Sequence, residues 1–184
     1  MLAPSLATML VVLTTDAVVP ADVLQRALAA ATSVSVERVD SDGLTAAATD
    51  LAMQLLADAE GSTKDIAITV RGAATVADAL TAGRACARNN LLKTALFGND
   101  PNWGRVLAAI GTTDAAFEAA GVDVTINGVT VCRGGGIGDP REGVDLTGRA
   151  ISIDVDLRAG TEEATIWTND LSIAYVHENS AYSS

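Results

Sequence analysis

The sequence predicts an α/β protein with a smaller α+β unit at its C-terminal end, and two patterns carry this prediction. Up to about residue 112, strand-like and helix-like stretches alternate, which is typical of a layered α/β fold. Beyond that point strand-like stretches follow one another, and a helix-like stretch closes the chain. We therefore divide the chain into an α/β layer over residues 1–112 and a small α+β domain over residues 113–184.

The α/β layer begins with an apolar run in which Val11, Val12 and Leu13 suit a strand buried on both faces. Between residues 40 and 43 an acidic turn lacks the further ligands of a calcium loop. Gly61 suits a left-handed helix cap, with Lys64 near the negative helix end. Apolar periodicity predicts helices over 20–31, 44–59, 74–88 and from Trp103, and strands over 34–39, 66–72 and 91–96.

The α+β domain carries the strongest hairpin signal in the chain, Asn127-Gly128 between two alternating runs. The glycine-rich stretch 133–140 matches neither a P-loop nor a dinucleotide fingerprint, so we expect a flexible connection there. Two more strands are predicted over 151–157 and 163–168. A final helix, capped by Asn169 or Asp170, should end near Glu178.

Composition excludes several classes of partner. The chain has 184 residues and a formal net charge of −11, whereas nucleic acids and anionic membranes attract clustered Lys and Arg. No apolar run approaches the roughly 18 residues of a membrane span, and no signal peptide is visible. We therefore expect a cytoplasmic protein that binds neither nucleic acid nor membrane.

Metal and disulfide chemistry have few side chains to use. Cys86 and Cys132 are too few and too far apart for a disulfide framework or a zinc site, and each is expected to be a small buried apolar residue. His177 is the single histidine, which excludes a site with several histidine ligands. No nucleophile-elbow motif offers His177 a serine partner for a catalytic triad.

Thr8 lies between the small Ala7 and the first apolar run. It is either an ordinary surface residue that enters a strand or a nucleophile freed by cleavage of the Ala7–Thr8 bond. A freed α-amine, with a reference pKa of about 7.7–8.0, can act as general base for the threonine hydroxyl. The residues alone leave both interpretations open.

Four stretches, in order along the chain, resemble one known family: MLAPSLATML at 1–10, AEGSTK at 59–64, LKTALFGNDPNWGR at 92–105 and ENSAYSS at 178–184. The family is the ornithine acetyltransferases, or glutamate N-acetyltransferases, of arginine biosynthesis. Its members are made as one precursor and split before a threonine into α and β chains. This chain resembles the β half with seven precursor residues attached. The resemblance implies half of a layered α-β-β-α sandwich of the N-terminal-nucleophile type.

The resemblance also implies a two-step acyl transfer. Thr8 would take the acetyl group of N2-acetylornithine and pass it from an acetyl-Thr intermediate to glutamate. Glu60 matches a carboxylate that binds the charged α-amino group of the substrate, and Asn179 and Ser184 match residues that help to bind it. No cofactor or metal is implied, although acetyl-CoA is an alternative acetyl donor. Asn102 and Arg105 are either part of a turn that supports the pocket or substrate contacts.

The partner implied by the family is the α chain of the same precursor, in an αβ hetero-oligomer such as a heterotetramer. That chain carries the Thr-Gly oxyanion donors and a lysine in a Lys-Gly-Ser-Gly stretch, so we expect this chain alone to be inactive. The sequence also departs from the family after Gly43. Relatives have a Ser-Thr-Asn-Asp motif, an apolar strand and a linker there, before the helix over 44–59.

Two other functions remain open. A related N-terminal-nucleophile hydrolase, such as an aminopeptidase, would pass the acyl group to water instead of glutamate. An inactive fragment or degenerate relative would lack the α half and the internal strand that relatives have after the position of Gly43. The acceptor of the acyl group separates the first alternative from an acetyltransferase, and the mass of the mature chain separates the second.

Overall fold

The structure, a computed structural model, describes residues 41–181 and the side chains of residues 48–181. The chain divides into two compact units between Leu55 and Leu56. Helix α3 (Ser41–Ala57) crosses this division, and the second unit contains every strand that the structure describes. Among the helices of residues 41–181, none is both long and apolar enough to cross a membrane. The predicted elements over 1–39 lie outside the described residues.

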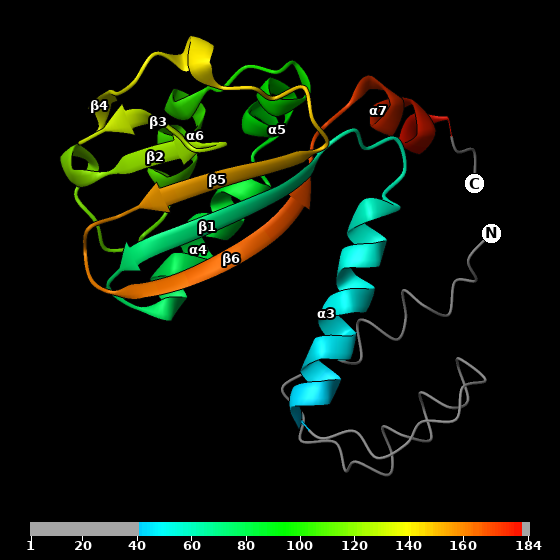
Figure 1. The fold of residues 1–184 in the computed structure, drawn as a ribbon, viewed down its shortest axis with the longest axis horizontal. Coiled ribbons are helices and arrows are strands. Elements are labelled where there is room, and N and C mark those ends of the chain that lie inside the picture. Colours follow the sequence, from blue (N-terminus) through cyan, green and yellow to red (C-terminus); the bar gives the residue numbers. More distant parts are fainter. Residues whose placement is uncertain (1–40, 182–184) are drawn as a thin grey trace. The chain divides into compact units, whose positions relative to one another are not determined.

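One mixed sheet of six strands forms the centre of the second unit, in the order β4-β3-β2-β5-β1-β6 (Figure 1). One neighbouring pair, β5 and β1, is parallel, with Ile66 opposite Ile151, and the other neighbours are antiparallel. The strands are β1 (Asp65–Ala73), β2 (Asp123–Ile126), β3 (Val129–Arg133), β4 (Gly136–Ile137), β5 (Ala150–Asp156) and β6 (Glu162–Asn169).

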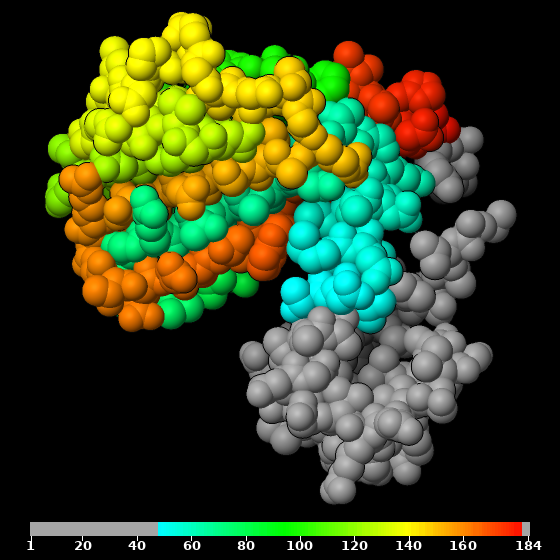
Figure 2. Space-filling view, viewed as in Figure 1, coloured from blue at the N-terminus to red at the C-terminus, as the bar shows by residue number. Residues whose placement is uncertain are grey.

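Helices α4 (Val76–Ala87), α5 (Asn90–Phe97) and α6 (Trp103–Ile110) lie on one face of the sheet (Figure 1). Ile66, Ile68 and Val70 alternate along β1 and are fully buried on that face, as the alternation of the sequence predicts. Gly83 lets α4 approach β6, since a Cβ there would lie 2.8 Å from Cγ1 of Ile166. No helix of the second unit that the structure describes covers the opposite face along β1, β5 and β6 (Figure 2), and the side chains on that face include Thr69, Asp154 and Thr165.

The polar face is ordered by hydroxyl pairs between neighbouring strands. Thr69 on β1 and Thr165 on β6 lie 2.9 Å apart, Oγ1 to Oγ1, and Thr125 and Thr130 pair in the same way at 3.0 Å. These pairs tie strands together on the solvent side, where apolar packing is absent.

The strand predicted over 91–96 is wrong, because this stretch forms α5. Asn89 caps the helix by accepting a hydrogen bond from the Leu92 amide. Leu92, Ala95 and Leu96 are buried at helical spacing. A short apolar run fits either element, and the capping asparagine is the feature that decides for the helix.

Of three helix starts, two differ in detail from the prediction, whereas α6 begins at Trp103 as predicted. α3 begins at Ser41, so the predicted turn is helical over its last three residues. α6 is capped by Asn102, whose Oδ1 accepts from the Arg105 amide. The last helix, α7 (Ile173–Ser180), is capped by Ser172 and not by Asn169 or Asp170. The side chains of those two residues turn instead toward the start of β1.

The glycine-rich stretch is a tight hairpin and not a flexible connection. Gly134 and Gly135 both have positive φ, 54° and 70°, which a two-residue hairpin turn of type I′ requires. The turn joins β3 to the short strand β4, with Arg133 opposite Gly136. The remaining described elements are two 3₁₀ turns, η1 (Ala119–Gly121) and η2 (Arg141–Gly143).

The predicted domains at 1–112 and 113–184 contribute strands to the same sheet, since β1 precedes the boundary and β2 to β6 follow it. The parallel pairing of β1 with β5 therefore joins segments on both sides of residue 112. The division of the whole protein into domains stays a prediction.

Two glycines in hairpin turns provide a test of this packing. Gly128 has a φ of 84° with no atom near its missing Cβ, whereas a Cβ on Gly135 would collide with the carbonyl group of Ala119. We expect Gly128→Ala to lower the free energy of unfolding by about 1–2 kcal/mol, the cost of a left-handed L-residue. Gly135→Ala should cost about 1–3 kcal/mol more because of the collision. Equal losses in urea unfolding would contradict the packed hairpin.

Candidate functional site

Glu60 lies in the turn between α3 and β1, at the end of the sheet where β1 and β5 begin and β6 ends. Its side chain is exposed and makes no hydrogen bond or ion pair with any residue in the part of the chain that the structure describes. An exposed carboxylate without a partner at a fixed position can accept hydrogen bonds from a cationic ligand. This is the predicted role of Glu60.

The turn that carries Glu60 rests on the first turn of α7. Gly61 has a φ of 66°, which confirms the predicted left-handed conformation, but α3 ends at Ala57, so Gly61 is not its cap as predicted. A Cβ on Gly61 would lie 2.6 Å from the carbonyl carbon of Ala174 and 2.8 Å from Cα of Tyr175. Only glycine allows two backbones to approach so closely. α7 also carries Asn179, so the structure brings the segments of two predicted site residues together.

Asn179 lies in the last turn of α7. Its Nδ2 donates to the carbonyl oxygen of Tyr175 at 2.8 Å, so the helix orients the amide group. The amide oxygen accepts from no described residue and can take a donor from a ligand. His177, on the same helix, is exposed and lies 3.6 Å from Glu178, Nδ1 to Oε1.

A buried carboxylate holds the chain that leads from Glu60 into β1. Asp170 is 1% exposed and follows β6 directly. Its Oδ1 accepts from the amides of Thr63 at 2.8 Å and Lys64 at 3.0 Å, and its Oδ2 accepts from the Thr63 hydroxyl at 2.5 Å. Three donors compensate for the burial of the charge.

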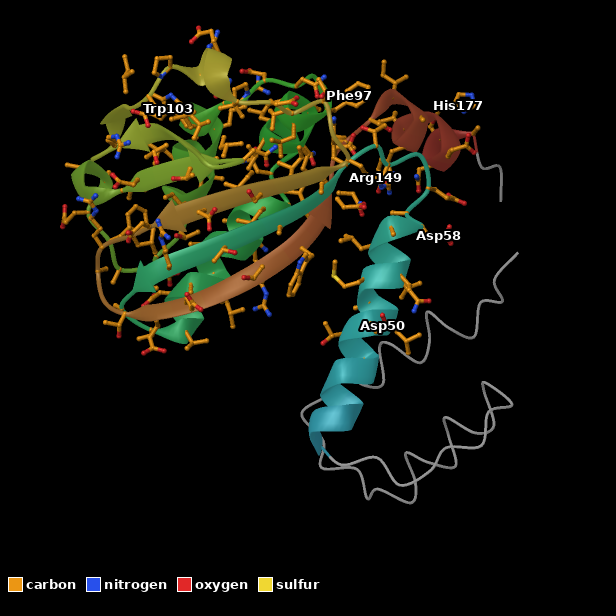
Figure 3. All side chains as sticks on the ribbon, viewed as in Figure 1. Asp50, Asp58, Phe97, Trp103, Arg149 and His177 are labelled. Carbon is orange, nitrogen blue, oxygen red and sulfur yellow. The ribbon has the colours of Figure 1, made fainter. Side chains whose placement is uncertain are left out.

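Two more polar side chains fix the same turn. Asn169 donates to the carbonyl oxygens of Leu56 and Lys64, at 3.1 Å and 3.0 Å. Arg149, at the start of β5, forms an ion pair with Asp65, 2.8 Å from Nε to Oδ2, and also reaches the carbonyl oxygens of Ala57 and Ser62 (Figure 3). The turn is therefore held from both of the strands that flank β1.

The sequence predicts that Lys64 lies near the negative end of α3, but the structure places its ammonium group on another segment. Its side chain is 6% exposed, and its ammonium group donates to the carbonyl oxygens of Leu146, Thr147 and Gly148 at 2.5, 3.4 and 3.0 Å. Three carbonyl acceptors stabilise the buried charge. Lys64 thereby joins the Glu60 turn to the loop that precedes β5.

An open, mainly apolar groove of about 390 Å³ runs between α5 and α7, with Phe97 on one side and His177 on the other (Figure 3). Its lining residues are Thr94, Phe97, Leu171, Ser172, Ile173, Val176 and His177. Ser172 is the member that also touches the Glu60 turn, through Gly61. The groove therefore borders the predicted site.

The turn over 97–105 has a structural role in the described chain. Asn102 caps α6 and also donates from Nδ2 to Asp100, at 2.9 Å. Arg105 donates from Nη1 to the carbonyl oxygen of Leu91, at 2.5 Å, which ties α6 to α5. These contacts favour the interpretation of Asn102 and Arg105 as parts of a supporting turn.

Thr8, the proposed nucleophile, and Ser184 lie outside the described residues, so their positions relative to Glu60 stay predictions. Three residues that hold the Glu60 turn, Asp170, Ser172 and Arg149, are not predicted by the sequence as parts of the candidate site. For Asp170 the sequence predicts only a helix cap, because a short polar side chain before a helix is typical of a cap. Its contacts are with residues more than a hundred positions away, for which a single sequence gives no signal.

The fold and site define a mixed α/β protein with a six-stranded sheet, at one end of which the Glu60 turn lies. The model of the ArgJ family matches residues 1–48 and 42–184. The chain therefore belongs to the ArgJ family.

Relatives with known names agree. The arginine biosynthesis bifunctional protein ArgJ of Streptomyces avermitilis is 55% identical over 212 aligned positions, which cover all of this chain and 55% of the relative. The protein of the same name from Thermobifida fusca is 54% identical, also with 55% of its length covered. The chain thus spans about half the length of these curated relatives. A crystal structure of the arginine biosynthesis bifunctional protein argJ from Bacillus halodurans matches with a TM-score of 0.73 at 32% identity, over 77% of this chain and 68% of that one.

The alignments indicate an internal segment that this chain lacks. The alignment with the Streptomyces avermitilis relative extends over 212 positions, whereas this chain has 184 residues. The two matches to the family model overlap at residues 42–48, which places the discontinuity there. This is the point after Gly43 where the sequence departs from the family's expected strand and linker.

The structural role of Asn102 leads to a prediction. Asn102→Ala removes the cap of α6, so the free energy of unfolding should fall by about 1 kcal/mol, the usual loss for an N-cap. Urea unfolding measures this loss. An unchanged free energy of unfolding would contradict the capping role of Asn102.

Lys93 on α5 gives a test by pH. Burial lowers the pKa of Lys93 below its usual 10.5, and the nearby Asp170 carboxylate partly offsets this by raising it. The folded chain therefore holds this proton less tightly than the unfolded chain. The contribution of Lys93 to stability should rise as pH increases through its folded pKa toward 10.5. Lys93→Met should remove this rise in the free energy of unfolding, measured by urea unfolding at alkaline pH. If the slope of that free energy against pH is unchanged in the variant, Lys93 is not the cause of the rise.

Proposed function

We propose that this chain is the β subunit of an ornithine acetyltransferase of arginine biosynthesis, which transfers the acetyl group of N2-acetylornithine to glutamate. The single observation that carries the proposal is the contact between Gly61 and the first turn of α7. It brings the Glu60 turn and the Asn179 helix together at one end of the sheet. Family membership supports the reaction class.

The proposed chemistry starts at Thr8. After cleavage of the Ala7–Thr8 bond, the free amine takes the proton of the Thr8 hydroxyl, and the oxygen attacks the acetyl carbonyl carbon of N2-acetylornithine. The amide bond breaks, ornithine leaves with a proton on its α-nitrogen, and acetyl-Thr8 remains. The amine of glutamate then attacks the ester, which forms N-acetylglutamate and restores the hydroxyl. Acetyl-CoA is a further acetyl donor that fits the same intermediate.

Binding is assigned to carboxylate and amide groups. Glu60 binds the charged α-ammonium group that ornithine and glutamate carry and that N2-acetylornithine lacks. Asn179 and Ser184 supply further acceptors, an amide oxygen and a hydroxyl. The absence of any partner for Glu60 among the described side chains supports this assignment.

The partner is an α chain that corresponds to the part of the relatives that this chain does not cover. It supplies the oxyanion donors, so the isolated chain is inactive and the αβ hetero-oligomer is the active form. We place this assembly in the cytoplasm. Its fold is an α-β-β-α sandwich to which the described sheet contributes.

The discontinuity at residues 42–48 favours a second candidate, an inactive relative that lacks an internal strand. Intact-mass measurement after co-expression with the upstream half of the Streptomyces avermitilis relative separates the two. We expect a species that begins at Thr8 and forms N-acetylglutamate from N2-acetylornithine and glutamate. A persistent Met1 start without transfer identifies the inactive relative, and release of acetate to water identifies an N-terminal-nucleophile hydrolase.

The role of Glu60 has its own test in that assembly. Glu60→Gln should weaken ornithine binding about tenfold or more, since a hydrogen bond to a charged group contributes about 1.5–3 kcal/mol. Binding of N2-acetylornithine, whose α-nitrogen is uncharged, should change much less. Glu118→Gln is the matched control, because Glu118 is also exposed and lies in a different loop. Equal losses for both ligands would contradict the assignment of Glu60 to the α-ammonium group.

A further inference from the structure

The hydroxyl of Ser172 connects the Glu60 turn to α7. Ser172 is 1% exposed. Its Oγ donates to the carbonyl oxygen of Gly61 and accepts from the amide of Tyr175, the latter at 2.9 Å. The same oxygen thus caps α7 and binds the residue directly after Glu60.

The close approach at Gly61 makes this connection rigid. The backbone of Gly61 packs directly on Ala174 and Tyr175, without space for a side chain. A buried hydrogen bond across a packed backbone contact leaves little freedom for either segment to move alone. Displacement of α7 along its axis would therefore displace Glu60.

Asp170 fixes the other side of the same turn. Its carboxylate accepts from the backbone of Thr63 and Lys64, and only Leu171 separates it from Ser172. The segment 170–172 thus binds the turn at two points, after Glu60 through Gly61 and further on through Thr63. The backbone that directly follows Glu60 is therefore held at two points.

We infer that Ser172 is a positioning residue for Glu60. Its hydroxyl couples the Glu60 turn to the helix that carries Asn179, so that the two segments move together. The inference rests on the proposed function for its chemical meaning, since Glu60 and Asn179 are the proposed substrate contacts. Two contacts on one ligand require a fixed separation, and small misplacements of such groups weaken binding strongly. Ser172 acts through Glu60 and touches no reacting atom.

Hydrogen exchange in the full 184-residue chain tests the mechanical part without any ligand. Ser172→Ala should accelerate exchange of the Ser62, Thr63 and Tyr175 amides together, by about fivefold to tenfold, as loss of a capping hydrogen bond does. Ser172→Thr keeps the hydroxyl and should restore the slow rates. Gly61→Ala tests the same contact from the other segment and should give the same pattern as Ser172→Ala. Acceleration confined to Tyr175 would overturn the inference.

Thr75→Ala is the matched control. Thr75 caps α4 by accepting from the Asp78 amide at 3.0 Å, so the variant also loses one capping hydroxyl. It should accelerate exchange at Asp78 and leave Ser62 and Thr63 unchanged. Equal acceleration at Ser62 in both variants would show a general loss of stability and overturn the role of Ser172.

Ornithine affinity in the co-expressed assembly tests the functional part. Ser172→Ala should weaken binding about fivefold when Glu60 is present and should have no effect on the Glu60→Gln background. Equal effects on both backgrounds would overturn the role of Ser172 as a positioning residue. If Glu60→Gln alone leaves affinity unchanged, the proposed function of Glu60 fails, and hydrogen exchange still decides whether Ser172 couples the two segments.

Discussion

The buried carboxylate of Asp170 is the interaction on which the candidate site depends. It accepts three hydrogen bonds from Thr63 and Lys64, and it follows the strand that pairs with β1. Without these donors a charge that is 1% exposed would be costly to bury. The hydrogen-bond donors of the turn therefore compensate for the burial of the carboxylate. In return the carboxylate fixes the conformation of the turn that carries Glu60. Helix α7 then starts three residues later, at Ile173, which places its first turn beside Gly61.

Polar side chains from three strands lie close together at this end of the sheet. β1 and β5 begin at this end and β6 finishes there, so Asp65, Arg149 and Asn169 come together from distant parts of the chain. Ordinary α/β geometry gives such an edge free backbone groups and loops, where binding sites form on a rigid support. The apolar core beneath it, built from residues such as Ile66 and Ile153, supplies that support.

Local patterns in the sequence were sufficient for most of the fold. The alternation over 66–72 predicts β1, and Asn127-Gly128 predicts the hairpin of β2 and β3, because each signal lies within a few residues. The prediction of a strand over 91–96 was wrong because a short apolar run has no unique period and fits a helix as well. Glu60 and Asn179 were predicted as site residues from the resemblance to a known family. The contacts of Asp170 and Ser172 with the Glu60 turn could not be predicted, since they depend on the completed topology.

The central claim is that the Glu60 turn lies directly on the first turn of α7, and it can be measured in the unmodified chain. A nuclear Overhauser experiment reports which protons lie close together in solution. We expect a strong effect between the Gly61 α-protons and the Tyr175 amide proton, because a Cβ on Gly61 would collide with the backbone nitrogen of Tyr175. The absence of this effect, in a chain whose β1 and β5 protons show the expected parallel pairing, would contradict it.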